Sequence, residues 1–388
     1  MNILFVTGLF AKDEKDTALS GMPNAVYKSA IGMQKREHRV QILTVANKDA
    51  RWHYRGLKVI SIQAKHGLEE KNILRSMFLI LKREYKIKKT IQLLHKEKPI
   101  DIIQYTGWFG IGLLHSLDIP AVMRISSYTK VQLTDNFDKG KRYLLETAEC
   151  LAAKRMNCVF APSRIMASGA EKDIKKKVYV IETPFLQEEV EWDDKILRTE
   201  LKNKRYVLFF GRMSVDKGIL VIRDVMYRIL QKYPDICFVF AGNSWKHNGV
   251  VIEEELMQAS REYKDRVIFP GLLSKNLLMP VISNAEVVLM PSLADNFPNA
   301  CAEAMALGKI VIGTDGSSLE QFIIDGKSGY LAKIGNADSL FSCLEHVLNM
   351  DVMQKRDISQ NAMERIRKLD VERYSATMEM LYNKVIAK

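Results

Sequence analysis

The sequence lacks several features that would quickly assign it to a class of protein. Cysteine is scarce and odd in number, with five widely spaced residues in 388: Cys150, Cys158, Cys237, Cys301 and Cys343. Neither a disulfide framework nor a zinc site is therefore predicted. No apolar stretch approaches the length of a membrane-spanning helix, and the N-terminus lacks the charged region and cleavage pattern of a signal peptide. We expect buried thiols in a cytoplasmic protein, soluble or peripheral.

Patterns for cofactors and metals are also missing. The seven histidines form no recognisable catalytic or metal-binding pattern, and the sequence contains no D-x-D. No G-x-G-x-x-G follows the first predicted strand, so a dinucleotide cofactor is not supported. We therefore predict that the protein uses neither a metal nor a cofactor.

Acidic residues are too few to balance the basic ones. The chain has 46 Asp and Glu against 58 Lys and Arg, a net charge of +12. The whole excess lies in residues 1–190, with 32 basic and 20 acidic residues, whereas residues 191–388 have 26 of each. Such a charge raises nucleic acid or an anionic membrane as partners. Because no RNA- or DNA-binding motif appears, we do not expect nucleic acid.

Much of the basic excess lies in one predicted helix, residues 71–98, with nine Lys or Arg and two Glu. Its apolar residues form two neighbouring stripes at helical spacing, first Ile73, Met77, Ile80, Ile87, Ile91 and Leu94, then Leu74, Phe78, Leu81 and Tyr85. One stripe is enough to pack on a sheet. The second either widens the core face or lets a basic amphipathic helix lie in an anionic membrane interface.

Short apolar runs alternate with helical patterns along the whole chain. The expected strands are 3–7, 40–46, 58–62, 100–105, 121–125, 158–161, 178–182, 205–210, 236–241, 267–269, 287–290 and 310–313. This alternation predicts α/β domains with parallel sheets, and the length suits two of them. We expect one domain over 1–186, a linker over 187–204, a second domain over 205–368, and a C-terminal helix over 369–388.

The most informative stretch is 291–331. A strand that ends before Pro291 is followed by a polar loop and then by a helix that starts near Pro298. Two acids, Asp295 and Glu303, flank the start of that helix, eight positions apart. A helix N-terminus attracts anions, whereas carboxylates suit the paired hydroxyls of a sugar. Alternatively, Glu303 complements the helix dipole and Asp295 is a turn residue.

A second loop, FFGRMSVDKG at 209–218, follows the first strand of the second domain. Arg212 and Lys217 lie between two glycines in this loop, and such a pair of cations suits a departing diphosphate. The alternative is a solvated loop in which Asp216 caps the next helix. Both loops follow strands of one predicted sheet, so they could line the same site.

With these blocks the sequence closely resembles the family 4 retaining glycosyltransferases of the GT-B fold. The resemblance covers the Gly21 loop, FFGRMSVDKG, AGNS at 241–244, RVIFPGLLS at 266–274, PSLADNFPNACAEAMALG at 291–308 and GTDGSSLEQFIIDGKSGYL at 313–331. It implies two Rossmann-like, doubly wound domains facing across a cleft, with the C-terminal helix packed back on the first. It also implies transfer of a sugar from a nucleotide-diphosphate sugar to a hydroxyl acceptor.

The resemblance also implies roles for individual residues. Arg212 and Lys217 would neutralise the diphosphate, Glu303 would hold the ribose, and Asp295 would bind hydroxyls of the transferred sugar. The remaining donor-binding positions would be Gly21, Gly211, Asn296, Phe297, Pro298, Asn299 and Ala300. No enzyme nucleophile and no metal are implied. The basic helix over 71–98 favours a glycan or lipid-linked glycan at the inner face of the cell membrane as the acceptor, and a soluble acceptor is the alternative.

Two positions depart from the family pattern. Asp295 replaces the usual first Glu of E-x7-E, and Arg124 stands at or near the place of a His that many members have, as a further candidate cleft residue. The nearest alternative function is a UDP-sugar 2-epimerase of the same fold. It would need an acid and a base in the cleft, and no such pair is evident.

Overall fold

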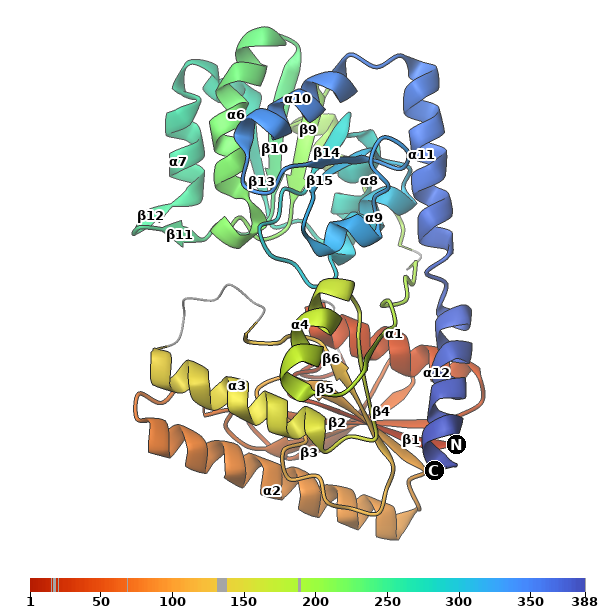
Figure 1. Cartoon of the computed structure of the whole chain (residues 1–388). Coiled ribbons are helices and arrows are strands. Elements are labelled where there is room, and N and C mark those ends of the chain that lie inside the picture. Colours follow the sequence, from red (N-terminus) through yellow and green to blue (C-terminus); the bar gives the residue numbers. More distant parts are fainter. Residues whose placement is uncertain are drawn as a thin grey trace. The chain divides into compact units, whose positions relative to one another are not determined.

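The computed structural model describes residues 1–14, 16, 19, 21–67, 69–130, 138–187 and 190–387. Ser20, which precedes the predicted site residue Gly21, lies outside the described residues. The chain divides into two compact units, one formed by Met1–Leu186 with Leu369–Lys388 and the other by Gln187–Lys368 (Figure 1). Each unit is an α/β domain built on a mainly parallel sheet, as predicted. No helix in the described residues is long and apolar enough to cross a membrane.

The first unit contains an eight-stranded sheet in the order β3-β4-β2-β1-β5-β6-β7-β8. Its strands are β1 (Asn2–Thr7), β2 (Arg39–Ala46), β3 (Ala50–Tyr54), β4 (Leu57–Gln63), β5 (Ile102–Gly107), β6 (Ala121–Ile125), β7 (Cys158–Ala161) and β8 (Val178–Val180). All neighbours pair in parallel except β3 and β4. The antiparallel edge strand β3 was not predicted. The sequence feature that could have indicated this strand is the tight turn at Arg55 and Gly56, which joins β3 to β4 and in which both residues have a positive φ.

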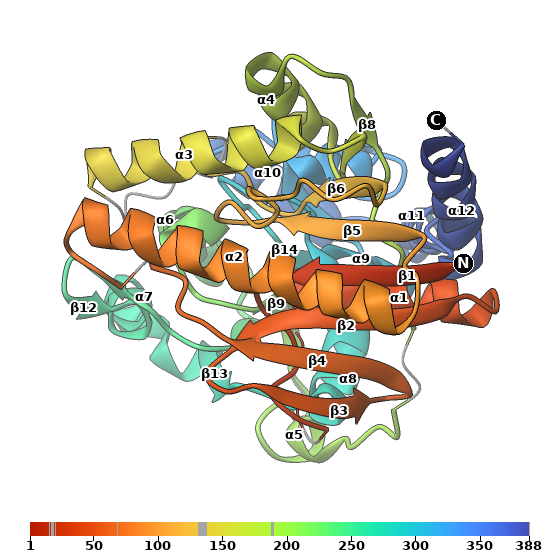
Figure 2. The ribbon, with the colours of Figure 1, turned by 90° about the horizontal axis from the view of Figure 1, so that it is seen from below.

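Helices cover both faces of this sheet because alternate strand residues point to opposite sides. Leu4 and Val6 pack with α2 (Ile73–Glu97), α3 (Lys139–Lys154) and α4 (Arg164–Ile174), whereas Ile3 and Phe5 pack with α1 (Gly21–Lys35) and α12 (Val371–Ile386). Figure 2 shows α2 and α3 side by side. The C-terminal helix α12 therefore belongs to the first unit, where Tyr374 Oη lies 2.9 Å from Ser29 Oγ.

The second unit contains a six-stranded parallel sheet in the order β13-β10-β9-β14-β15-β16. Its strands are β9 (Arg205–Phe210), β10 (Ile236–Ala241), β13 (Val267–Gly271), β14 (Val287–Leu289), β15 (Val311–Thr314) and β16 (Tyr330–Ala332), with a small hairpin of β11 (Lys246–His247) and β12 (Val250–Val251). Neither β16 nor the hairpin was predicted, because both are too short to show a hydrophobic period.

The helices of the second unit pack around this sheet. They are α5 (Lys195–Thr199), α6 (Ile219–Lys232), α7 (Ile252–Ala259), α8 (Lys275–Asn284), α9 (Asn299–Ala306), α10 (Ala337–Leu348) and α11 (Val352–Arg367). Side chains of α6, α7 and α10 share one apolar core with β9, β10, β14 and β15. Residues 187–204, expected as a linker, contain α5, which packs against α8.

Strand order determines where loops of each unit converge. In the second unit the chain runs from β9 outward through β10 and β13, and then returns to the other side of β9 at β14. The loops after β9 and β14 therefore both start at the carboxyl ends of their strands and then run in opposite directions. Open α/β sheets bind ligands at such a point. In the first unit the same reversal lies between β1 and β5.

Candidate functional site

The loop after β9 is shaped by glycines. Gly211 has a φ of +119°, and its amide donates to the carbonyl of Ala241 at 2.9 Å. Gly242 follows β10, and a Cβ there would lie 1.8 Å from the Gly211 oxygen. Only glycine permits this approach of two backbones. The 3-10 turn η1 (Val215–Lys217) then leads through Gly218 into α6.

Arg212 is held by three neighbours within this part of the unit. Its guanidinium donates to Asp216 Oδ2 at 2.6 Å and to Ser214 Oγ at 3.0 Å, and it lies 4.4 Å from the centre of the Trp245 ring. The alternative in which Asp216 caps the next helix is excluded, because the N-cap of α6 is Gly218, which has no side-chain cap. Asp216 orients Arg212 instead, leaving a half-exposed cation at the sheet edge.

The loop after β14 is joined to the loop after β9. The amides of Leu293 and Ala294 donate to the carbonyl of Asp216 at 2.9 and 3.3 Å. An ion pair links the side chains as well, with Lys217 Nζ donating to Asp295 Oδ2. The Asp295 side chain is 12% exposed and that of Lys217 28%, so both are largely shielded yet reachable.

A close backbone contact also fixes the separation of these two loops. Gly218 has a φ of +72°, and a Cβ there would lie 1.8 Å from the carbonyl oxygen of Pro291. The end of the loop after β9 therefore packs directly on the start of the loop after β14. This contact holds Lys217 near Asp295 by backbone geometry, in addition to the attraction between their charges.

Helix α9 starts at this edge of the sheet. Its N-cap is Pro298, which makes no capping hydrogen bond, and the preceding Phe297 packs on Phe322 with ring centres 4.5 Å apart. The first turn therefore offers backbone N–H groups beside the Lys217–Asp295 pair. Glu303 is half-buried in the middle of this helix. Beside it, burial raises the pKa of the Cys301 thiol and the Asp295 charge raises it further.

The edge therefore combines three kinds of group. Arg212 and Lys217 supply positive charge, the start of α9 supplies N–H donors, and Asp295 and Glu303 supply carboxylates. The first two suit phosphate oxygens, and carboxylates suit hydroxyl donors. No group of three or more His, Cys, Asp or Glu that could hold a metal ion occurs within the described residues.

The structure brings Lys217 and Asp295 into contact, and it places the predicted site residues of the second unit in the loops after β9 and β14 and in α9. Two neighbours were missed. Asp216 was named only in the alternative interpretation, as a helix cap. Trp245 was not considered, although an exposed tryptophan next to the AGNS block is an unusual residue that could have been noticed.

The two remaining predicted residues belong to the first unit. Gly21 is exposed and begins α1 with a φ of +54°, and nothing lies within 4 Å of a Cβ built there. Arg124 is buried near the end of β6, where it donates to Thr183 Oγ1 at 2.7 Å and also to Ser126 Oγ. Burial lowers the pKa of its guanidinium.

Residues 192–365, almost the whole second unit, match the model of the family described as "Glycosyl transferases group 1". The second unit therefore resembles a group 1 glycosyltransferase domain. A curated relative, the phosphatidyl-myo-inositol mannosyltransferase of Mycolicibacterium smegmatis, is 25% identical over 183 residues, which are 47% of this chain and 45% of that protein. Alignments with the first curated relatives cover between 39% and 59% of their length, so the chain spans about half of them.

Solved structures of similar fold match the chain over its whole length. Sucrose-phosphate synthase from Thermosynechococcus elongatus matches over 100% of both chains at 20% identity, with a TM-score of 0.77. The Anabaena protein HepE in complex with UDP matches over 99% of this chain and 100% of its own at 17% identity, with a TM-score of 0.73. These likenesses concern the fold, and they confirm the predicted GT-B class.

Proposed function

We propose that the protein is a retaining glycosyltransferase that moves a sugar from a nucleotide-diphosphate sugar to a hydroxyl acceptor without a metal ion. The observation that carries the proposal is the Lys217–Asp295 pair near the N-terminus of α9, at the strand-order reversal of a domain that resembles group 1 glycosyltransferases. Cations, N–H donors and carboxylates occur there together, and a nucleotide sugar needs all three.

The proposed donor site uses each group for one part of the ligand. Arg212 and Lys217 bind the diphosphate, assisted by backbone donors around Phe297 to Ala300. Asp295 accepts hydrogen bonds from hydroxyls of the sugar, and Glu303 accepts them from the ribose. The complex of HepE with UDP supports a uridine nucleotide as one donor class, since that protein shares the fold.

The chemistry then depends on the leaving group. The acceptor oxygen forms a bond to the anomeric carbon while the bond from that carbon to the phosphate oxygen breaks, and the acceptor proton passes to that phosphate oxygen on the same face. No enzyme nucleophile is involved. Charge grows on the diphosphate as it leaves, so preorganised cations such as Lys217 lower the barrier without an added metal.

For the acceptor we propose a glycan or a lipid-linked glycan, with the protein at the cytoplasmic face of a membrane. The mannosyltransferase relative is named for a phosphatidyl lipid, phosphatidyl-myo-inositol, which supports this class of acceptor. The basic first half of the chain, with its helix over 71–98, supports it independently.

A thermal-shift screen of UDP, GDP and ADP and their sugars tests the donor site. One nucleotide should raise the unfolding temperature, and its sugar should then be transferred to an acceptor with retention of configuration in the presence of EDTA. Absence of any nucleotide shift would refute the donor assignment. Conversion of the donor sugar without any acceptor would favour the 2-epimerase.

A further inference from the structure

Helix α2 exposes a line of large apolar side chains. Leu74, Phe78, Leu81 and Tyr85 are between 39% and 68% exposed, and Met77 beside them is 42% exposed. Their spacing of three and four residues places them on one side of the helix over about 16 Å of its length. We call these five residues the apolar stripe.

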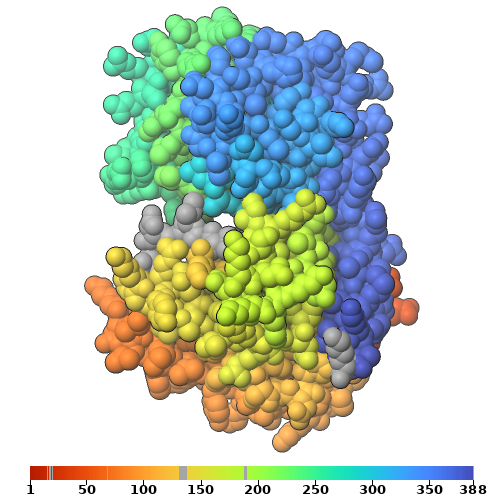
Figure 3. Space-filling view, viewed as in Figure 1, coloured from red at the N-terminus to blue at the C-terminus, as the bar shows by residue number. Residues whose placement is uncertain are grey.

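The fold does not need this stripe. The opposite side of α2 already packs on the sheet through the buried residues Ile87, Ile91 and Leu94. The neighbouring helix α3 adds to the exposed surface through Tyr143, which is 72% exposed, and its Gly140 lies against Ile73. Figure 3 shows α2 in orange and α3 in yellow at the surface of the first unit. Contiguous apolar surface of this kind marks an interaction site.

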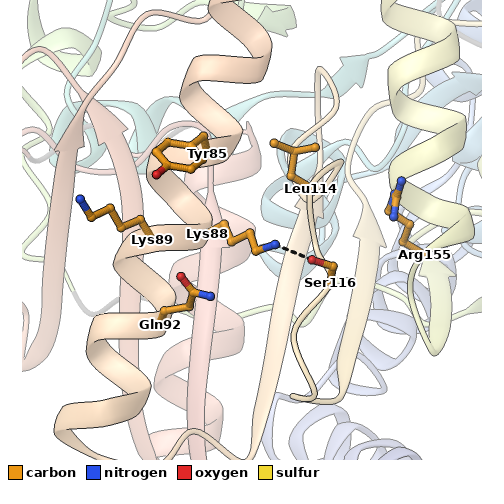
Figure 4. A pocket seen from close by; sticks show the side chains of 7 residues that line it. All are labelled: Tyr85, Lys88, Lys89, Gln92, Leu114, Ser116 and Arg155. Atoms are coloured by element: carbon orange, nitrogen blue, oxygen red, sulfur yellow. Dashed lines mark hydrogen bonds between the residues drawn. The ribbon is translucent and has the colours of Figure 1, made fainter.

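A basic pocket continues the apolar stripe toward the C-terminus of α2. It has a volume of about 330 Å³ and is lined by Tyr85, Lys88, Lys89, Gln92, Leu114, Ser116 and Arg155. Figure 4 shows that α2 contributes four of these side chains, with Leu114 and Ser116 on the loop opposite. Lys88 Nζ donates to Ser116 Oγ at 2.5 Å.

This pocket has three cations and no acid among its lining residues. Along α2, which is described throughout, Glu84 is buried and Glu97 is the last residue, so no carboxylate lies on the exposed side between the stripe and the pocket. Lys88, Lys89 and Gln92 fall on the same side of the helix as Leu74, at 14, 15 and 18 positions further on. One helix side is therefore apolar in its first turns and cationic afterwards.

We propose that α2 docks the first unit on an anionic phospholipid bilayer. The apolar stripe enters the boundary between headgroups and acyl chains, and the pocket of Lys88, Lys89 and Arg155 binds a lipid phosphate. Apolar side chains and uncompensated cations on one helix side match the two parts of an anionic lipid. The surface is separate from the proposed donor site and does not depend on it.

Other occupants would leave part of this surface unexplained. A protein partner with an apolar face would cover the stripe but leave three cations buried without anions, which is costly. Free phosphate would fit the pocket and leave the stripe in water. Flotation with vesicles distinguishes these occupants from a lipid bilayer.

Co-flotation with vesicles tests the proposal on the full chain. The protein should float with vesicles of phosphatidylcholine and phosphatidylglycerol at low salt, bind phosphatidylcholine vesicles weakly, and be released by high salt. Inorganic phosphate at equal ionic strength should release no more protein than a chloride salt. No flotation with anionic vesicles, or selective release by phosphate, would overturn the proposal.

Two sets of variants separate the charges from the apolar contacts. Each cation near an anionic surface contributes about a fivefold gain in binding, so Lys88→Gln, Lys89→Gln and Arg155→Gln together should weaken anionic-vesicle binding about 100-fold. Phe78→Ser with Leu81→Ser should weaken it about tenfold or more. As controls, Lys264→Gln with Lys327→Gln in the second unit, and Leu93→Ser on α2 but off the stripe, should bind like the wild type.

A tryptophan placed in the apolar stripe reports how deeply this side of α2 enters the bilayer. Phe78→Trp should show a blue-shifted emission and quenching by brominated lipid acyl chains, whereas Val352→Trp, at an exposed position of the second unit, should show neither. Equal quenching at both positions would refute the assigned face. The thermal shift with nucleotides should be the same in all of these variants, so failure of this docking is distinguishable from failure of the donor site.

Discussion

Lys217 and Asp295 form an ion pair across 78 residues of sequence, between the loops that follow β9 and β14. The pair is shielded but reachable, and Gly218 packs its loop on Pro291 beside it. In the proposed complex a phosphate oxygen joins Lys217 while a sugar hydroxyl joins Asp295. The ion pair would thus set the distance between the sites for the diphosphate and for the transferred sugar.

Lys217→Ala should lower kcat about 10²- to 10³-fold, because a preorganised charge on the leaving diphosphate is lost. Steady-state kinetics with saturating donor measures the effect. Lys232→Ala is the matched control, since Lys232 is an exposed lysine in the same unit that is also paired with a carboxylate, that of Glu345. Near-normal turnover of Lys217→Ala would show that this lysine does not contact the leaving group.

Asp295→Asn should lower kcat more than it weakens nucleotide binding. The amide removes the negative charge and one acceptor facing the sugar, while the cations and backbone donors for the diphosphate remain. Isothermal titration with the free nucleoside diphosphate should give an affinity within about threefold of the wild type, equivalent to less than about 1 kcal/mol. A large loss of nucleotide affinity would mean that Asp295 acts by holding the loop rather than by binding sugar.

Glu303→Ala, in contrast to Asp295→Asn, should mainly weaken donor binding. KM for the donor should rise about tenfold or more, because a hydrogen bond from ribose to a carboxylate contributes about 1.5 to 3 kcal/mol. The affinity for the free nucleotide should fall by the same factor. Unchanged nucleotide affinity would favour the alternative in which Glu303 only complements the dipole of α9. A small loss of stability alone would then be expected, about 0.3 to 1 kcal/mol.

Gly218→Ala should destabilise the second unit by about 3 kcal/mol or more, since it combines a positive φ with a Cβ against the Pro291 oxygen. Gly326→Ala is the control, because Gly326 has a similar φ of +69° but nothing within 4 Å of its Cβ. That variant should lose only about 1 to 2 kcal/mol. Equal unfolding temperatures for the two variants would mean that the loops can separate at Pro291.

Glu149 should make the stability of the first unit depend on pH. Its carboxyl accepts hydrogen bonds from the Phe109 and Thr129 amides, yet burial raises its pKa to about 7 from 4.5. The folded state thus binds the proton more tightly than the unfolded state, so stability is highest below pH 4.5 and falls as the pH rises toward 7. The loss is up to about 3 kcal/mol.

The measurement compares unfolding of the wild type with that of Glu149→Gln between pH 5 and pH 8. The difference between the two proteins isolates this carboxyl from the half-buried His66 and the buried His115, whose pKa values are lowered by desolvation. The wild type should lose more stability across this range than the variant. Parallel pH profiles would show that Glu149 is already ionised at pH 5.

The sequence alone determined the two α/β domains, most strand positions and the two loops of the candidate site. Those features follow from short-range patterns, such as the apolar run before Pro291 and the glycines of FFGRMSVDKG. Such patterns depend only on residues close together in the sequence. The parallel sheets then implied that the loops leave from strand ends. The Gly218 contact with Pro291 could not be predicted, because it depends on the strand order.

Tertiary structure decided which side chains meet. Lys217 reaches Asp295 because β14 pairs with β9, and Trp245 covers Arg212 because β10 pairs with β9 on the other side. The same is true of α2, where helical spacing revealed two apolar stripes but only packing on the sheet showed that Ile87, Ile91 and Leu94 are buried whereas Met77 is exposed. A hydrophobic pattern states what a side chain prefers, whereas the surface available to cover it is set by segments far away in the chain.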